Sequence, residues 1–250
     1  MILLTFNIAI SEKGRENNNK FSMPELISSI DDNTKIILNL LDLHEYKASF
    51  FVEVSIVEPL QKLLKTLSLS GHEIGIYNVN SDVEEAEKTK HYLEQILQKP
   101  VKGLRQKSHH LPYSEIKRMD FIYVSNIKDS KIDFLWRKLT GKTEIYTEND
   151  LTVVPESQSP YSQLPFNDYV LQVTPMKYYE SMLLESLKSE EYVMVYINAW
   201  QLLSKDKLPF ILPFYKKINL GRSFEDRLED LFQFMDEHEI AVSRMKDYLF

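Results

Sequence analysis

The strongest constraint on the fold is a regular alternation of short apolar runs with segments whose apolar residues recur at helical spacing. Such alternation predicts parallel strands joined by helical crossovers. We expect strands at 2–10, 47–54, 72–79, 101–107, 121–127, 151–155, 192–200 and 240–244. Helices are expected at 33–46, 55–70, 81–98, 112–119, 174–189 and 223–239, whereas 128–149 fits no pattern clearly.

Three residues mark helix ends in this pattern. Gly71 stands where a C-terminal glycine cap belongs. Ser81 opens the capping-box sequence Ser-Asp-Val-Glu, and Ser223 stands at the start of the last helix, so both are predicted N-caps.

The length favours one domain. A chain of 250 residues is within the range of single α/β barrels, so we expect one domain spanning residues 1–250. About eight strands predict a barrel or distorted barrel, and in such barrels the site lies at the C-terminal ends of the strands.

Composition limits the kinds of binding partner and the cellular compartment that we expect for this chain. A net charge of −7 without a basic stripe argues against nucleic acid and against an anionic membrane surface. The chain has no cysteine, which excludes disulfides and thiolate metal sites. No stretch reaches the ~20 apolar residues of a membrane span. The first residues lack the basic region of a signal peptide, so the cytoplasm is the expected location.

Five segments, read in chain order, resemble one family. They are KASFFV at 47–52, GHEIG at 71–75, VKGLR at 101–105, VYINAW at 195–200 and NLGR at 219–222. Together they resemble the polysaccharide deacetylases, which are metal-dependent N- and O-deacetylases of sugars. The resemblance implies a single deformed (β/α) barrel of about seven to eight mostly parallel strands and a place in carbohydrate or glycan metabolism.

The acid and base positions of that family are substituted in this chain. The family has a general base after Thr-Phe and an acidic metal ligand one or two places further on. The matching positions are Asn7 and, within the following run, Ala9. An amide cannot take a proton from water at neutral pH, so Asn7 cannot be that base. The late histidine of the family, a general acid, corresponds to Asn198.

The metal ligands are substituted as well. The two histidine ligands of the family correspond to Tyr77 and Ser81, and neither residue is a normal ligand of such a site. Arg105 is retained, whereas the proline two places on is Lys107. A metal hydrolase needs the bound metal to lower the pKa of water. The resemblance therefore implies a pseudoenzyme with no metal or other cofactor.

The first functional hypothesis is a non-catalytic protein that binds a sugar, a glycan or a protein partner in a polysaccharide pathway. Arg105 and Lys107 share one face of a strand, and without the acid they suit an anionic sugar. On this hypothesis Arg105→Ala weakens ligand binding and leaves folding largely intact. An ion pair with Glu156 or Asp168 is the alternative role for these cations. The candidate ligand contacts are Asn7, Tyr77, Arg105, Lys107, Asn198 and Trp200.

Two further hypotheses remain open. The chain could be an active metal-dependent carbohydrate deacetylase whose site, holding zinc or another divalent metal, is rebuilt from His109, His110, Glu156 or Asp168. Alternatively, it could be a structural subunit whose cleft is filled by Tyr77 and its neighbours.

Overall fold

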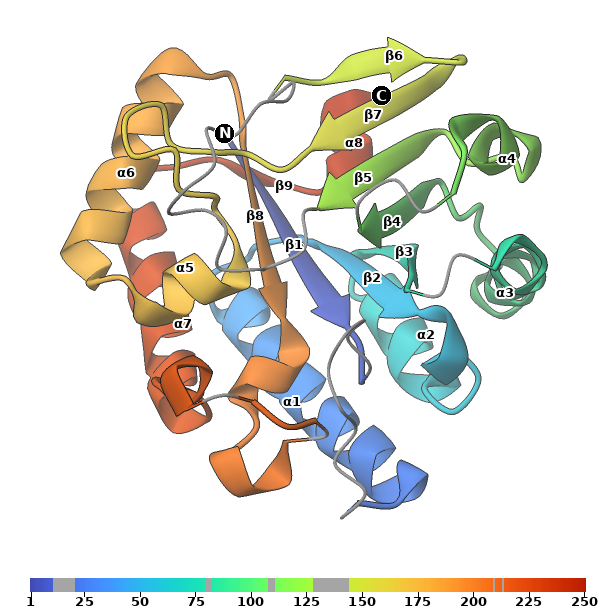
Figure 1. Ribbon diagram of the computed structural model, residues 1–250, viewed down its shortest axis with the longest axis horizontal. Coiled ribbons are helices and arrows are strands. Elements are labelled where there is room, and N and C mark those ends of the chain that lie inside the picture. The colour runs from blue at the N-terminus through green and yellow to red at the C-terminus, as the bar shows by residue number, and fades with distance from the viewer. Residues whose placement is uncertain (11–20, 80–81, 108–110, 128–143, 209, 213) are drawn as a thin grey trace.

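One curled sheet with helices packed around it makes up the fold, as the computed structural model shows (Figure 1). The structure describes residues 1–10, 21–79, 82–107, 111–127, 144–208, 210–212 and 214–250. The strand order is β6-β7-β5-β4-β3-β2-β1-β8, and β9 also pairs with β1. Every pairing is parallel except that of β6 with β7. This arrangement confirms the predicted deformed barrel of mostly parallel strands.

The strands are β1 Ile2–Ile8, β2 Ser49–Glu53, β3 Glu73–Asn78, β4 Gly103–Lys107, β5 Tyr123–Ile127, β6 Tyr146–Glu148, β7 Leu151–Pro155, β8 Val193–Asn198 and β9 Val242–Ser243. The α-helices are α1 Met23–Leu43, α2 Gln61–Leu69, α3 Val83–Leu97, α4 Tyr113–Arg118, α5 Asp168–Val173, α6 Met176–Ser189, α7 Arg222–Glu237 and α8 Met245–Leu249. In the described part of the chain, none of them combines the length and apolar character that crossing a bilayer requires.

Several helix starts differ from the sequence prediction. Helix α1 begins at Met23 rather than at 33, because Ser22 and Glu25 form a capping box there. A 3₁₀ turn precedes α2, which begins at Gln61 instead of at 55. The N-cap of α3 is Asp82, whose side chain accepts the N–H of Glu85, and not the predicted Ser81.

The two other predicted helix ends had different outcomes. The N-cap of α7 is Gly221, so the predicted cap Ser223 lies inside the helix. At the end of α2, Gly71 has a φ of +90° directly after the C-cap Ser70, as predicted. The His72 N–H bonds to the Leu67 carbonyl there, which completes the C-terminal cap.

Alternating side chains of the strands build two cores. Along β1, the even-numbered residues Ile2, Leu4, Phe6 and Ile8 belong to the large cluster that packs against the helices. Leu3, on the opposite face, belongs to a smaller cluster with residues of the other strands, and this cluster fills the barrel. Its members include Phe51, Tyr77, Tyr123, Met194 and Tyr196.

The barrel is not closed by strand pairing. The end strands of the sheet path are β6 and β8, and no ladder joins them in the described residues. Instead, the segment after β7 bonds to β8. The Met194 N–H donates to Ser157 Oγ at 2.9 Å, and the Tyr196 N–H donates to the Phe166 carbonyl at 3.2 Å. This segment carries Glu156 and leads to Asp168 at the start of α5, which places both near the C-terminal end of β8.

Candidate functional site

Strand register brings the predicted site residues to one edge of the sheet. Asn7 of β1 lies opposite Asn198 of β8, and Tyr77 of β3 lies opposite Arg105 of β4. All four stand at or near the C-terminal ends of parallel strands, which is where a barrel of this kind places its site. The structure thus brings these four residues to one edge of the sheet, and their role as a site stays a prediction.

Three of these side chains, Arg105, Asn7 and Asn198, form one hydrogen-bonded series with Asp168, which we call the amide chain. Arg105 Nη1 donates to Asn7 Oδ1 at 2.7 Å. Asn7 Nδ2 donates to Asn198 Oδ1 at 3.0 Å, and Asn198 Nδ2 donates to Asp168 Oδ2 at 2.5 Å. A guanidinium can only donate and an ionised carboxylate can only accept, so the two ends of the amide chain fix the orientation of both amides.

Arg105 is fully buried in the barrel. Its Nε donates to Ser125 Oγ at 3.1 Å and its Nη2 to Thr5 Oγ1 at 2.9 Å. The guanidinium also lies 4.1 Å from the centre of the Phe51 ring. Burial lowers the pKa of Arg105 to about 10, so the side chain remains a cation at neutral pH.

The predicted ion pair of Arg105 is not formed. Within the described residues its hydrogen-bond partners are neutral, and Glu156 acts on it only as an electrostatic attraction that favours the charged form. Asp168 binds Asn198 instead. Lys107 is also buried, with 8% of its surface exposed. A ligand contact by Arg105 or Lys107 stays a prediction.

The two aromatic candidates lie in different cores. Tyr77 is 1% exposed and belongs to the cluster inside the barrel. Trp200 follows β8, is 2% exposed and packs edge-on against Phe210 with ring centres 4.9 Å apart. It belongs to the outer core, so the structure does not bring it into the amide chain.

Of the family's metal positions, the two that the structure describes, Ala9 and Tyr77, do not suit a divalent metal. Ala9 has no side-chain donor, and a tyrosine hydroxyl is not a usual ligand of such a site. At the base position, Asn7 Oδ1 is bonded to Arg105. Across the described ranges, no three His, Cys, Asp or Glu side chains gather as a metal site. Three residues named in the sequence predictions, Ser81, His109 and His110, lie outside the described residues.

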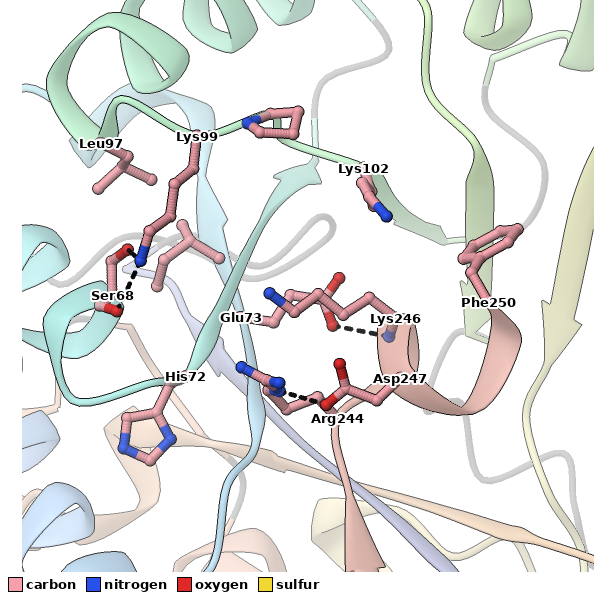
Figure 2. Close-up of a pocket in the computed structure, with 12 residues that line it drawn as sticks. Ser68, His72, Glu73, Leu97, Lys99, Lys102, Arg244, Lys246, Asp247 and Phe250 are labelled. Carbon is pink, nitrogen blue, oxygen red and sulfur yellow. Dashed lines mark hydrogen bonds and ion pairs between the residues drawn. The ribbon is translucent and has the colours of Figure 1, made fainter.

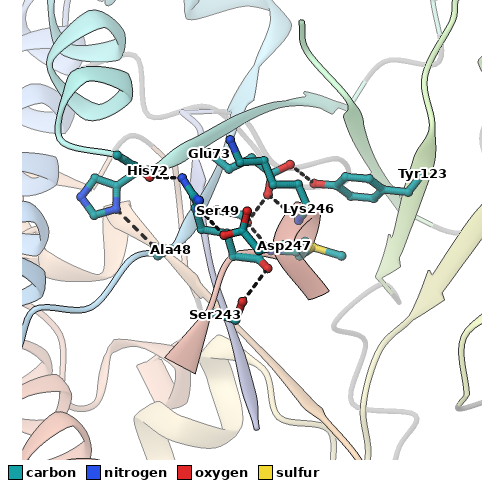
Figure 3. Close-up of polar contacts among 11 residues, drawn as sticks. Ala48, Ser49, His72, Glu73, Tyr123, Ser243, Lys246 and Asp247 are labelled. Carbon is teal, nitrogen blue, oxygen red and sulfur yellow. Dashed lines mark hydrogen bonds and ion pairs between the residues drawn. The ribbon is translucent and has the colours of Figure 1, made fainter. Parts of the chain in front are cut away.

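The pair His72-Glu73, from the GHEIG segment, lies at the opposite, N-terminal edge of the sheet, where it lines a pocket (Figure 2). Glu73 accepts hydrogen bonds from Ser49 Oγ at 2.6 Å, from Tyr123 Oη at 2.8 Å and from the Lys246 N–H at 3.1 Å (Figure 3). These bonds fasten α8 to β2, β3 and β5. Glu73 thus belongs to the framework of the barrel.

Sequence reasoning missed Thr5 and Ser125, which both contact Arg105. A signal for Thr5 exists, because Thr5 and Asn7 are polar residues two places apart in an otherwise apolar strand, and so share its inner face. It also missed helix α5, although Asn167 before Asp168 is a typical N-cap and accepts the N–H of Val170 at 2.9 Å.

No family model matches the chain, and no curated protein matches it in sequence. Solved structures do match. A Mycobacterium smegmatis protein described as a polysaccharide deacetylase has a TM-score of 0.64 at 13% identity, over 99% of this chain and 87% of that one. A CE4 family pseudoenzyme from Bacillus anthracis has a TM-score of 0.55 at 13% identity, over all of this chain and 65% of its own. An allantoinase has a TM-score of 0.59 at 13% identity, over 98% and 87%.

These likenesses define the class of fold: a curled α/β barrel of the polysaccharide deacetylase type. This chain has that fold, in agreement with the resemblance seen in the sequence. The chain spans about two thirds of the length of the Bacillus anthracis pseudoenzyme. A mutant of that pseudoenzyme is described as having restored enzymatic activity, and an allantoinase shares the fold, so the fold by itself assigns neither activity nor substrate.

Proposed function

We propose that this chain is a divergent, non-hydrolytic relative of the polysaccharide deacetylases. It is a single-domain cytoplasmic protein that acts in carbohydrate or glycan metabolism by binding a sugar or a protein partner. The observation that carries the proposal is the amide chain. In it, the side chains at the positions of the family's base and acid, Asn7 and Asn198, are hydrogen-bonded to each other and to Arg105 and Asp168.

The chemistry of the amide chain argues against hydrolysis. A general base must hold a free lone pair near its water and have a pKa near the working pH. Asn7 is neutral, and its oxygen and nitrogen are engaged by Arg105 and Asn198. Asn198 in turn is engaged by Asp168. Neither amide can exchange a proton with water at neutral pH, so neither can replace the acid or the base.

The binding role is supported by the place and character of the site. Asn198, which keeps 6% of its surface exposed at the C-terminal end of β8, suits a polyhydroxylated ligand, because an amide both donates and accepts hydrogen bonds. Arg105 and Lys107 add positive charge, which favours a carboxylated or phosphorylated sugar.

Metal content tests the non-hydrolytic part of the proposal. The protein is purified without a histidine tag, equilibrated with zinc, freed of excess metal and measured by atomic emission. We expect far less than one equivalent of zinc and no release of acetate from acetylated chito-oligosaccharides. A matched positive control is the variant Asn7→Asp, Ala9→Asp, Tyr77→His, Ser81→His and Asn198→His, which returns the family's residue types.

Near-stoichiometric zinc in the unmodified protein would overturn the proposal. It would direct attention to the rebuilt site, with His109, His110, Glu156 and Asp168 as donors. Acetate release without zinc would overturn it equally, because a different hydrolytic site would then be at work.

A second candidate is a structural subunit with a filled cleft. It is favoured by the burial of Asn7, Tyr77 and Arg105, which are each at most 1% exposed. Titration with neutral and acidic oligosaccharides, followed by NMR, separates the two. Saturable shifts that Asn198→Ala abolishes support ligand binding, whereas no shift with any sugar supports the structural role.

A further inference from the structure

A second site lies far from the amide chain, at the N-terminal edge of the sheet. It is a pocket of about 530 Å³ between the start of β3, the segment between α3 and β4, and α8 (Figure 2). Four cationic side chains line it: Lys99, Lys102, Arg244 and Lys246. We call it the basic pocket. Its volume is within the range of small-molecule sites, which is about 300–1,000 Å³.

The basic pocket concentrates positive charge on a chain whose net charge is −7. Its two carboxylates are Glu73 and Asp247. Glu73 is buried and accepts three hydrogen bonds from Ser49, Tyr123 and the Lys246 backbone. Asp247 pairs with Arg244. Both carboxylates also attract the Lys246 ammonium, but four cationic side chains against two carboxylates leave an excess of positive charge in the pocket.

Two of the lysines have ammonium groups without a carboxylate partner among the described residues. The Lys102 ammonium lies over the Phe250 ring, 5.5 Å from its centre. The Lys246 side chain makes no ion pair in the part of the chain that the structure describes, although its backbone N–H is bonded to Glu73. Lys99, by contrast, donates to the Ser68 carbonyl at 3.3 Å.

The charges in the basic pocket act on one another. Burial and, after it, repulsion from Arg244 lower the pKa of Lys246, and attraction to Glu73 and Asp247 partly offsets this lowering. An anion held among these cations would remove that repulsion. Figure 2 shows Lys102 and Lys246 lining the same pocket from separate elements.

The lining also indicates the kind of anion. Arg244 already donates to Asp247 and to the Gly71 carbonyl, so it is not free for the planar, two-bonded grip that suits a carboxylate. Lysines act as compact point charges, and two of them suit a dianion better than a single carboxylate. Leu97, Pro100 and Phe250 supply an apolar wall for the uncharged part of a ligand.

We propose that the basic pocket binds a soluble phosphate monoester or diphosphate, with Lys102 and Lys246 as the principal contacts. The pocket and the amide chain lie at opposite ends of the strands, so this proposal does not rest on the proposed function.

Calorimetric titration with inorganic pyrophosphate tests the proposal, with inorganic phosphate as the smaller probe. The full chain is compared with Lys102→Gln, Lys246→Gln and the double variant. Lys88→Gln is the matched control, because it removes the same charge from a side chain that is 80% exposed on α3. Thermal unfolding checks that each variant remains folded.

We expect saturable pyrophosphate binding that weakens with added salt. Each pocket substitution should weaken it at least about tenfold, the effect of one charge-assisted hydrogen bond. Lys88→Gln should leave it within about twofold, because exposed charges contribute little. The proposal is overturned if neither probe binds up to about 1 mM, where the interaction is at the weak end of specific binding. It is also overturned if the double variant binds as well as Lys88→Gln.

Discussion

Replacing Arg105 should destabilise the barrel, and the structure sets the size of the effect. Arg105→Met keeps most of the buried volume but removes the donors to Thr5, Asn7 and Ser125. Thr5 Oγ1 still donates to the Val195 carbonyl. The main cost is then the unsatisfied Asn7 oxygen, about 1–3 kcal/mol.

Arg105→Ala should cost more than Arg105→Met. It leaves the same oxygen unsatisfied and also opens a cavity of roughly 100 Å³, which adds about 2 kcal/mol at about 24 cal/mol per Å³. The total, about 4 kcal/mol, is close to the cost of breaking a buried charged network. This burial reverses the expectation from sequence that Arg105→Ala leaves folding largely intact.

Equilibrium unfolding in guanidinium chloride, followed by circular dichroism, measures both effects. Arg222→Ala is the control, because Arg222 is 71% exposed and should change the free energy of unfolding by no more than about 0.5 kcal/mol. If Arg105→Ala lies within about 1 kcal/mol of the unmodified protein, the amide chain does not hold the barrel together as argued. If Arg105→Met costs as much as Arg105→Ala, the cavity contributes nothing.

Two other predictions concern the framework of the barrel. Burial lowers the pKa of His72 from 6.5 to about 4. At pH values between these two, the imidazole is therefore protonated in the unfolded chain and neutral in the folded chain. The free energy of unfolding should therefore fall by up to about 3 kcal/mol as the pH drops through this window. The His72→Gln variant should show a smaller fall. Denaturation midpoints at several pH values measure both. Gly103→Ala should cost about 3 kcal/mol in the same unfolding assay, because its new Cβ would lie 2.1 Å from the Tyr123 ring. A cost below about 0.5 kcal/mol would mean that the ring can move aside.

The sequence predicted the sheet well because its strands are continuous apolar runs and its segments follow a known family order. The same order predicted that Asn7, Arg105 and Asn198 would meet, because parallel strands end at one edge. It could not predict how they would bond. The direction of the amide chain depends on Asp168, which lies in a segment that alternating patterns do not describe.

Burial was the other property that the sequence could not supply. Arg105 suggested a ligand contact because the acid that accompanies it in the family is missing from this chain, and the sequence did not show that the side chain is fully buried. The structure provides Thr5, Asn7, Ser125 and the Phe51 ring around it, and these partners come from three other strands. The predicted starts of α1 and α3 were wrong for a local reason, because Ser22 and Asp82 act as N-caps through contacts within a single helical turn.

The pairing of β1 has a consequence for the order in which the chain folds during synthesis. β1 pairs with β2, but it also pairs with β8 along Ile2–Asn7 and with β9 at Ile2 and Leu3. β1 therefore leaves the ribosome long before β8 and β9, two of its three partner strands. At about 5–20 residues per second, one edge of β1 stays unpaired for roughly ten to forty seconds. Until β8 has been made, that edge of β1 is open to pairing with other chains, so the time spent in synthesis is a period of exposure to aggregation.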